Sequence, residues 1–163
     1  MTFDDMVLSD SIEIAASAEA VYDVVSNVTR VGEWSPETHT GAWTQEAAPV
    51  VGARFKGTNK TDAFERATPC VVTAAERGNR FAFDVIGGDD GNGASWSWDI
   101  EPSGDGVTLT QRFEIGPSLG GFRGFGRGKT DDEIDALVTN RIAELRAGMA
   151  TSLARVKALA EPS

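Results

Sequence analysis

The chain has 163 residues, 40% of them hydrophobic and 25% charged, which is typical of one globular domain that needs neither a disulfide nor a metal to fold. Its net charge of −10 is opposite to the charge that nucleic-acid binding requires, and it disfavours anionic membrane surfaces. No apolar stretch approaches the ~20 residues of a membrane span, and the acidic first ten residues lack a signal-peptide run. We therefore expect a cytoplasmic protein with no nucleic-acid partner and no membrane insertion.

The first 36 residues predict one strand followed by two short helices. Apolar and polar residues alternate at 12–14, as in a strand. Ser17 is an expected N-cap, and valines at helical spacing follow it to about Asn27. A second short turn of helix is expected over 29–34, where the following Pro36 disfavours a longer helix.

Six more strands are predicted between residues 39 and 116, where the hydrophobic period changes to two. Pro69 interrupts one of them, so we expect it on a sheet edge or at a bulge. Short connections rich in Gly, Asn and Asp indicate hairpins, and hence antiparallel neighbours. The residues expected to share a face within each strand are His39/Gly41/Trp43, Phe55/Gly57/Asn59, Phe64/Arg66/Cys70, Phe81/Phe83/Val85, Trp96/Trp98/Ile100 and Val107/Leu109/Gln111/Phe113/Ile115.

A glycine-rich loop over 116–129 precedes a long C-terminal helix. Thr130 and Glu133 form a capping-box pattern at its start. Apolar residues then recur at helical spacing over about 27 residues, roughly 40 Å at 1.5 Å per residue. The helices lie beside an antiparallel sheet, which is the α+β class.

Two segments near the start of the chain are distinctive, namely IEIAASAEAVYDVV at 12–25 and EWSP at 33–36. Three later ones are GARFKGTN at 52–59, CVV at 70–72 and RFAFDV at 80–85. In this order of elements, they resemble the START-like, or SRPBCC, superfamily and its helix-grip (START/Bet v 1-like) fold, and the later segments are similar to its polyketide cyclase/dehydrase-type branch. The resemblance implies a curved antiparallel sheet of six to seven strands wrapped around the C-terminal helix, in one domain over 1–163.

Aromatic side chains gather on the predicted inner face of the sheet. A curved sheet and one straight helix diverge at one end, and such a space commonly becomes a ligand pocket, although each ring taken singly is better explained as part of the core. Asn59 and Gln111 would make either core hydrogen bonds or ligand contacts, and Arg66 would either hold a carboxylate or enolate oxygen or lie on the surface. The expected ligand-binding residues are Trp34, Trp43, Phe55, Asn59, Arg66, Phe83, Trp96, Trp98, Gln111, Phe113, Phe122 and Phe125.

Phe122 and Phe125 belong to the glycine-rich loop, which we interpret as a lid over the pocket; the alternative is a simple connection. Catalytic residues stay unassigned. His39, the only histidine, is a weak candidate for a base at the cavity mouth, and Cys70 is interpreted as a small buried apolar residue. The acidic turn at 89–92 lacks the ligand spacing of an EF-hand, so we expect no metal and no cofactor.

These features favour a carrier or sensor that binds a lipid, a polyketide or an aromatic compound, as a monomer or weak homodimer. One alternative is an aromatase/cyclase-type enzyme that polarises oxygens with Gln111, Asn59 and Arg66. The other is a protein-interaction module of the co-chaperone or toxin–antitoxin type, which an exposed apolar patch and a filled core would favour.

Overall fold

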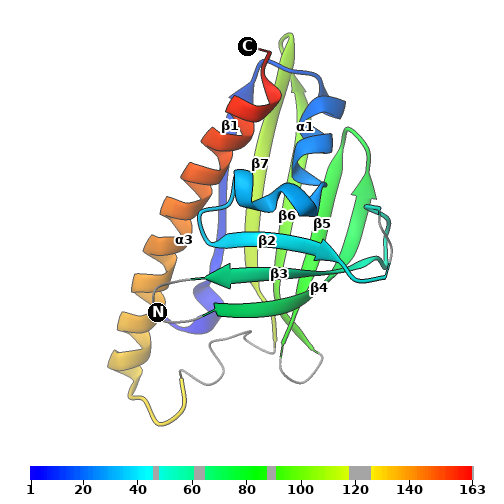
Figure 1. The fold of residues 1–163 in the computed structure, drawn as a ribbon. Helices are drawn as coiled ribbons and strands as arrows, with labels where there is room; N and C mark the ends of the chain where they lie inside the picture. Colours follow the sequence, from blue (N-terminus) through cyan, green and yellow to red (C-terminus); the bar gives the residue numbers. More distant parts are fainter. Residues whose placement is uncertain (46–47, 61–64, 88–90, 118–125, 163) are drawn as a thin grey trace.

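The computed structural model describes residues 1–45, 48–60, 65–87, 91–117 and 126–162, and its elements follow the predicted order (Figure 1). A short 3₁₀ turn, η1, precedes the first strand and was not expected from the sequence. The elements are η1 (Phe3–Asp5), β1 (Val7–Ile14), α1 (Ala18–Val25), the 3₁₀ helix η2 (Val28–Glu33), β2 (Thr38–Trp43), β3 (Arg54–Lys60), β4 (Glu65–Glu76), β5 (Arg80–Ile86), β6 (Asn92–Ser103), β7 (Gly106–Ile115) and α3 (Asp131–Ala160).

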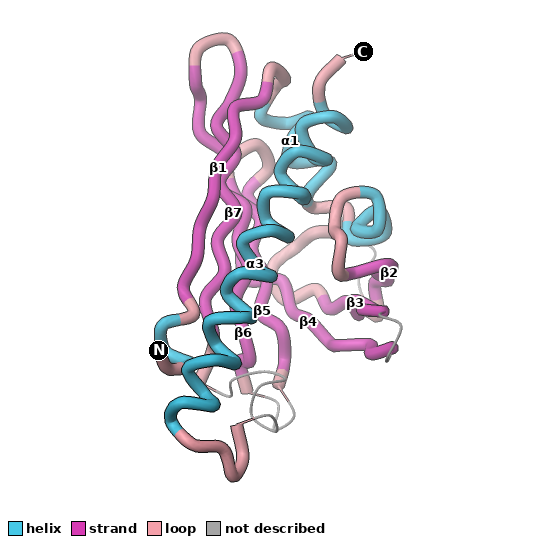
Figure 2. The backbone as a smooth tube through the Cα atoms, turned by 90° about the vertical axis from the view of Figure 1, so that its left-hand side faces the viewer, coloured by secondary structure: helices cyan, strands magenta, loops and turns pink. Residues whose placement is uncertain are grey.

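The seven strands form one antiparallel sheet in the order β1-β7-β6-β5-β4-β3-β2. Consecutive strands are neighbours, except that β1 pairs with the last strand, from Val7 opposite Glu114 to Ile14 opposite Val107. The sheet bends around α3, so that β1 and β7 lie on one side of the helix and β2–β4 on the other (Figure 2). The predicted α+β helix-grip architecture is confirmed.

Helix α3 begins as the sequence predicts and is slightly longer than expected. The Thr130 hydroxyl accepts from the Glu133 backbone N–H, and the Glu133 carboxylate accepts from the Thr130 N–H, which completes the capping box over a 30-residue helix. The predicted apolar stripe is buried in two clusters. One surrounds Leu153 and Val156 beside α1, and the other surrounds Val138 and Leu145 beside β1 and β7.

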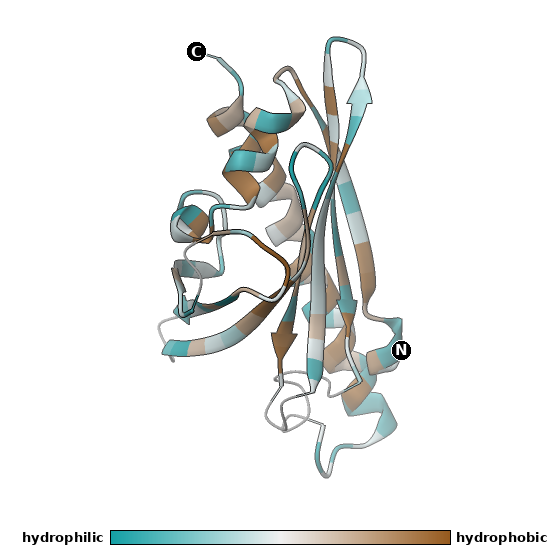
Figure 3. Ribbon diagram, turned by 90° about the vertical axis from the view of Figure 1, so that its right-hand side faces the viewer, coloured by the Kyte–Doolittle hydropathy of each residue, from teal (hydrophilic) through white to brown (hydrophobic). Residues whose placement is uncertain are grey.

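Hydrophobic and hydrophilic residues alternate along the strands, visible as brown and teal segments in Figure 3. In β7, Val107, Leu109, Gln111 and Phe113 are all buried, as their period of two predicts. One face of the sheet therefore packs inward and the other faces water. Within the described ranges, no helix has the length and apolar character needed to cross a membrane.

The alternation prediction fails in β2. The pairing of β2 with β3 shifts between Thr38 and Thr40, so Thr38 joins the face of Gly41 while His39 turns outward. Helix η2 lies directly against this strand: a Cβ atom built on Gly41 would lie only 2.1 Å from the Val28 carbonyl oxygen. Glycine at position 41 therefore sets the close approach of η2, which builds one wall of the site described below.

Pro69 lies at a local edge of the sheet, as expected, although its strand is not an edge strand and has no bulge at this residue. It belongs to β4, which lies between β3 and β5, and the register shift of β4 falls later, between Val72 and Ala74. The Val72 N–H donates to Ala53 on the β3 side, so alternation turns the nitrogen of Pro69 toward β5. Because β5 pairs with β4 only from Cys70 onward, the missing N–H removes no ladder bond.

Candidate functional site

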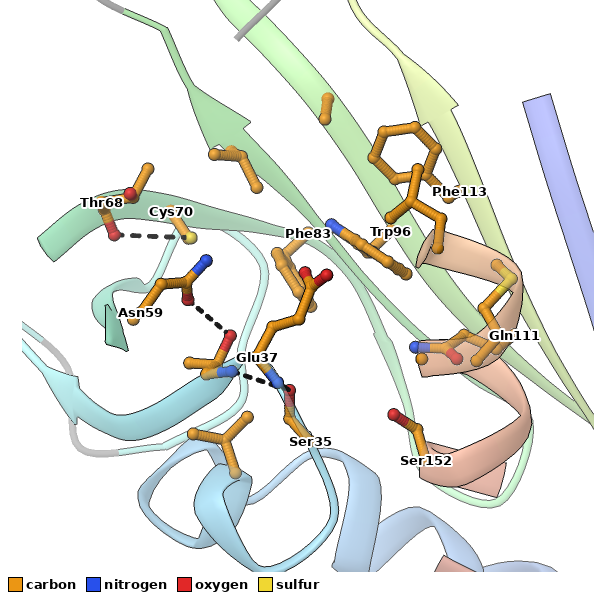
Figure 4. Close-up of a pocket in the computed structure, with 18 of the residues that line it drawn as sticks. Ser35, Glu37, Asn59, Thr68, Cys70, Phe83, Trp96, Gln111, Phe113 and Ser152 are labelled. Atoms are coloured by element: carbon orange, nitrogen blue, oxygen red, sulfur yellow. Dashed lines mark hydrogen bonds between the residues drawn. The ribbon is translucent and has the colours of Figure 1, made fainter. Parts of the chain in front are cut away.

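A cavity of about 860 Å³ lies between the inner face of the sheet, η2 and α3. Ligand pockets for small organic molecules typically measure about 300–1,000 Å³, so this space is large enough for such a molecule. Its lining combines aromatic side chains with a smaller number of polar groups from both the strands and the helix (Figure 4).

Aromatic rings from four strands and from the end of η2 line the cavity. Three edge-to-face pairs hold them: Phe55 with Phe83 (centroids 5.1 Å apart), Trp96 with Phe113 (4.8 Å) and Trp34 with Trp98 (5.2 Å). This geometry is favourable because the positive edge of one ring faces the negative face of the other. The rings therefore form a rigid apolar surface, and all six belong to the set expected from the sequence.

Trp43 does not line the cavity, which corrects its expected position. Its ring packs behind Phe55, with centroids 5.7 Å apart, and supports the wall from outside. His39 is also absent from the lining, because the bulge in β2 turns it toward the Lys60 carbonyl oxygen, 2.9 Å from Nε2. The remaining two expected aromatics, Phe122 and Phe125, lie outside the described residues, as does Phe64.

A polar row crosses three strands at one end of the cavity. Thr38 pairs with Asn59 in the register of β2 and β3, and Asn59 pairs with Arg66 in that of β3 and β4. The Thr38 hydroxyl donates to Asn59 Oδ1 over 2.8 Å. All three residues line the cavity, so Asn59 and Arg66 lie where the sequence placed them, although Arg66 is largely exposed at the rim.

Gln111 is the deepest polar residue that the sequence singled out, and only 5% of it is exposed. Both Gln111 and Ser152 of α3 line the cavity (Figure 4). The Oε1 atom is buried and has no hydrogen-bond partner within the described part of the chain. Because a half-turn of the amide exchanges its oxygen and nitrogen, Gln111 can offer either an acceptor or donors to a molecule in the cavity.

Cys70 lines the cavity but is not a reactive thiol. Its Sγ lies 3.7 Å from the Thr68 carbonyl oxygen as a weak donor, and burial raises its pKa to about 12. The thiolate, which is the nucleophilic form, is therefore almost absent near neutral pH. The prediction of a small buried cysteine is confirmed.

An ion pair that the sequence did not reveal joins α3 to the connection between η2 and β2. Arg141 donates from Nη1 and Nη2 to the two carboxylate oxygens of Glu37, over 2.7 and 3.0 Å, and also reaches Glu144 at 3.0 Å. Burial alone would lower the pKa of Arg141, but the hydrogen bonds and charges of these two carboxylates raise it overall. Ser35 Oγ fixes the backbone of the connection by accepting from the N–H groups of Glu37 (3.3 Å) and Thr38 (3.0 Å).

The helix contributes to the cavity through a second stripe beside its apolar core stripe. Residues three or four apart on a helix share one face, and the cavity residues of α3 follow that spacing. The sequence signal was present, but these residue types are ordinary for a solvated helix face. The stripe consists of Leu137, Arg141, Glu144, Gly148 and Ser152. Within the described residues, no group of three or more His, Cys, Asp or Glu is arranged to hold a metal ion.

Comparison with known families accounts for nearly the whole chain. Residues 6–161 match the family described as "Polyketide cyclase / dehydrase and lipid transport". The chain belongs to this family. No protein with a curated description matches it.

Solved structures support the same assignment. The Polyketide_cyc-like protein Cgl2372 from Corynebacterium glutamicum is 32% identical, covers 93% of this chain and 88% of its own, and has a TM-score of 0.66. The di-domain ARO/CYC protein StfQ of the steffimycin pathway is 20% identical with a TM-score of 0.71. BexL, a di-domain ARO/CYC protein of the BE-7585A pathway, is 16% identical with a TM-score of 0.67. The alignments with StfQ and BexL include 94% and 97% of this chain but only 50% of each of those longer proteins. At these identities, the likeness shows the fold alone.

Proposed function

We propose that the protein binds an apolar small molecule in the cavity between sheet and helix, as a cytoplasmic carrier or sensor. The observation that carries this proposal is the cavity itself, about 860 Å³ in volume and lined by seven aromatic residues of the described chain. A well-packed core leaves few voids larger than a water molecule, because each unfilled volume forfeits dispersion contacts. A space of this size next to two intact core clusters is better explained by a ligand than by imperfect packing.

The polar groups of the wall limit the chemistry of the ligand. Gln111, Asn59 and Ser152 are neutral, and they offer hydrogen bonds at separate points of a mostly apolar surface. A buried polar group without a partner costs about 1–3 kcal/mol, which a ligand oxygen would recover. We therefore infer a lipid-like, polyketide-like or aromatic compound that carries at least one oxygen.

A cyclase function is the second candidate, favoured by the family and by the two ARO/CYC structures of similar fold. Aromatic ring closure requires a group that moves protons near the reacting atoms. In the described part of the lining, the carboxylates are Glu37 and Glu144, both bonded to Arg141, and Cys70 stays protonated. Binding without chemistry is the simpler account of this set. A bound compound recovered unchanged after long incubation supports it, whereas recovery of a cyclised or dehydrated product supports the cyclase.

A protein-interaction module fits the structure less well. That function would be favoured by a filled core and a contiguous exposed apolar patch. The described residues instead line a cavity, and their exposed large hydrophobic residues belong to four separate parts of the chain: Met1, Val7, the adjacent Val50 and Val51, and Leu159. We propose one domain over 1–163 that acts as a monomer or weak homodimer.

Fluorescence titration tests the proposal without knowledge of the natural ligand. Three of the four tryptophans line the cavity, namely Trp34, Trp96 and Trp98. The neutral apolar dye N-phenyl-1-naphthylamine should therefore bind the delipidated protein at one saturable site, with energy transfer from tryptophan. Uptake that does not saturate, or no uptake at all, would contradict a preformed apolar cavity.

A further inference from the structure

The charge of the described part of the cavity lining is opposite in sign to the charge of the chain. The whole sequence carries 25 acidic and 15 basic residues, for a net charge of −10. In the described part of the lining, the charged residues are three basic ones, Lys60, Arg66 and Arg141, and two acidic ones, Glu37 and Glu144. Their sum is +1. An excess of basic residues at the cavity of a strongly acidic protein favours a negative charge on the charged part of the ligand, where it has one.

The bidentate contact between Arg141 and Glu37 shows which anion fits. The planar guanidinium fork matches the two oxygens of a carboxylate, and both oxygens of Glu37 are engaged, over 2.7 and 3.0 Å. The Glu37 side chain points into the cavity (Figure 4). Its carboxylate therefore occupies the position that a ligand carboxylate would take on Arg141.

The neighbouring residues complete a polar end of the cavity. Glu37 directly precedes Thr38, the first member of the row that continues through Asn59 to Arg66. Neighbouring strands lie about 4.8 Å apart, so the backbone of Arg66 lies about two strand spacings from that of Thr38. The long Arg66 side chain can therefore extend toward an anionic group bound beside Thr38. Among the described residues, neither Arg66 nor Lys60 forms an ion pair, whereas Arg141 forms two.

We propose that this end of the cavity binds the carboxylate of an amphipathic acid. In the absence of the acid, the Glu37 carboxylate binds Arg141 at the position that the ligand carboxylate would take. The inference rests on the proposed function, because the apolar body of the acid must fill the aromatic cavity. The ligand carboxylate replaces that of Glu37 on Arg141, with Arg66 and Lys60 as second cations. Glu37, which is already about one-third exposed, turns toward solvent on the connection between η2 and β2.

Two probes of equal shape separate the carboxylate from the apolar body. Anthracene-2-carboxylic acid carries the charge, whereas anthracene-2-carboxamide does not, and both accept energy from the tryptophans of the cavity. Arg141→Met is expected to weaken binding of the acid about tenfold and of the amide less than twofold, because only the acid uses the fork. Glu37→Gln is expected to strengthen binding of the acid about threefold, because it removes the internal competitor.

The double variant Glu37→Gln/Arg141→Met guards against misfolding, since it leaves neither charge of the pair unpartnered. It should bind the amide as the unmodified protein does and the acid about tenfold more weakly. Equal affinity of the unmodified protein for acid and amide, or equal losses of both in Arg141→Met, overturns the carboxylate site and leaves the apolar cavity standing. Failure of both probes to bind the unmodified protein overturns the carboxylate site and the proposed function together.

Discussion

Gly148 of α3 and Pro36 of the η2–β2 connection both line the cavity, and a Cβ atom on Gly148 would lie 3.7 Å from Pro36 Cγ. That distance is an ordinary van der Waals contact, so alanine fits without displacement. Glycine in a helix interior costs about 1 kcal/mol relative to alanine. Gly148→Ala should therefore raise the free energy of unfolding by up to about 1 kcal/mol, measured by urea denaturation. A loss of stability would mean that the helix backbone at this point is not free to accept a side chain.

A large side chain at the same position should close the cavity. Gly148→Phe places a ring in the space between α3 and the aromatic wall, and we expect the affinity for N-phenyl-1-naphthylamine to fall at least about tenfold. Gly148→Ala is the matched control, since it changes the same backbone position without filling the space. Normal dye binding by a folded Gly148→Phe variant would contradict the location of the site.

Gln111 should contribute to ligand affinity but not to the stability of the ligand-free fold. Its Oε1 is buried without a described partner, so Gln111→Met, which keeps the approximate volume, is expected to raise the free energy of unfolding of the ligand-free protein by about 1 kcal/mol. The same variant should retain less of any compound that co-purifies with the unmodified protein. A stability loss above about 1 kcal/mol would show that Gln111 makes a structural hydrogen bond.

Cys70 should be inert while the protein is folded. With its pKa raised to about 12, roughly one thiol in ten thousand is ionised at pH 8, against a substantial fraction of an exposed cysteine. We expect dithionitrobenzoate to label the native protein at least about a hundredfold more slowly than the protein in guanidinium chloride. Rapid labelling of the native protein would show that the cavity wall around Cys70 opens readily.

Acid should loosen the C-terminal end of α3. The Lys157 ammonium and the Ala15 N–H, which donates to Glu161 Oε2 over 2.7 Å, hold the pKa of the Glu161 carboxyl below its ordinary value of 4.5. A lowered pKa in the folded state means that the stabilisation is complete above about pH 4.5 and is lost as the pH falls through the folded-state pKa.

Glu161→Gln should therefore lower Tm at pH 6 and flatten the decline of Tm below pH 4.5, measured by circular dichroism. Glu101→Gln, at an exposed position of β6, is the control and should keep the full decline. Identical pH profiles for Glu161→Gln and the unmodified protein would remove Glu161 from the acid response.

The fold was predictable because local signals agreed with each other. Thr130 and Glu133 define the start of α3, Ser17 caps α1, and the alternation over 107–115 identifies the inward residues of β7. The prediction failed where one residue changes the register. Because of the bulge in β2, Thr38 lies on the inner face where the alternation predicted His39. A period-two pattern contains no information about such a shift.

The polar end of the cavity could not be predicted for a different reason. Glu37 lies in a connection and Arg141 on a helix 104 positions away, so their meeting depends on how α3 crosses the sheet. Sequence spacing does reveal which residues share a helix face, and it places Arg141 and Gly148 on the same face of α3. It does not reveal that this face borders a cavity rather than water, because that depends on the curvature of the sheet.

Native mass spectrometry of the freshly purified chain, beside its Gly148→Phe variant, tests the cavity most directly. We expect the unmodified protein to carry a small apolar molecule, or to take up one N-phenyl-1-naphthylamine when the dye is added, and Gly148→Phe to do neither. A molecule bound equally by both proteins would contradict the cavity as the binding site. The absence of any bound species on the unmodified protein, even with excess dye, would contradict ligand binding itself.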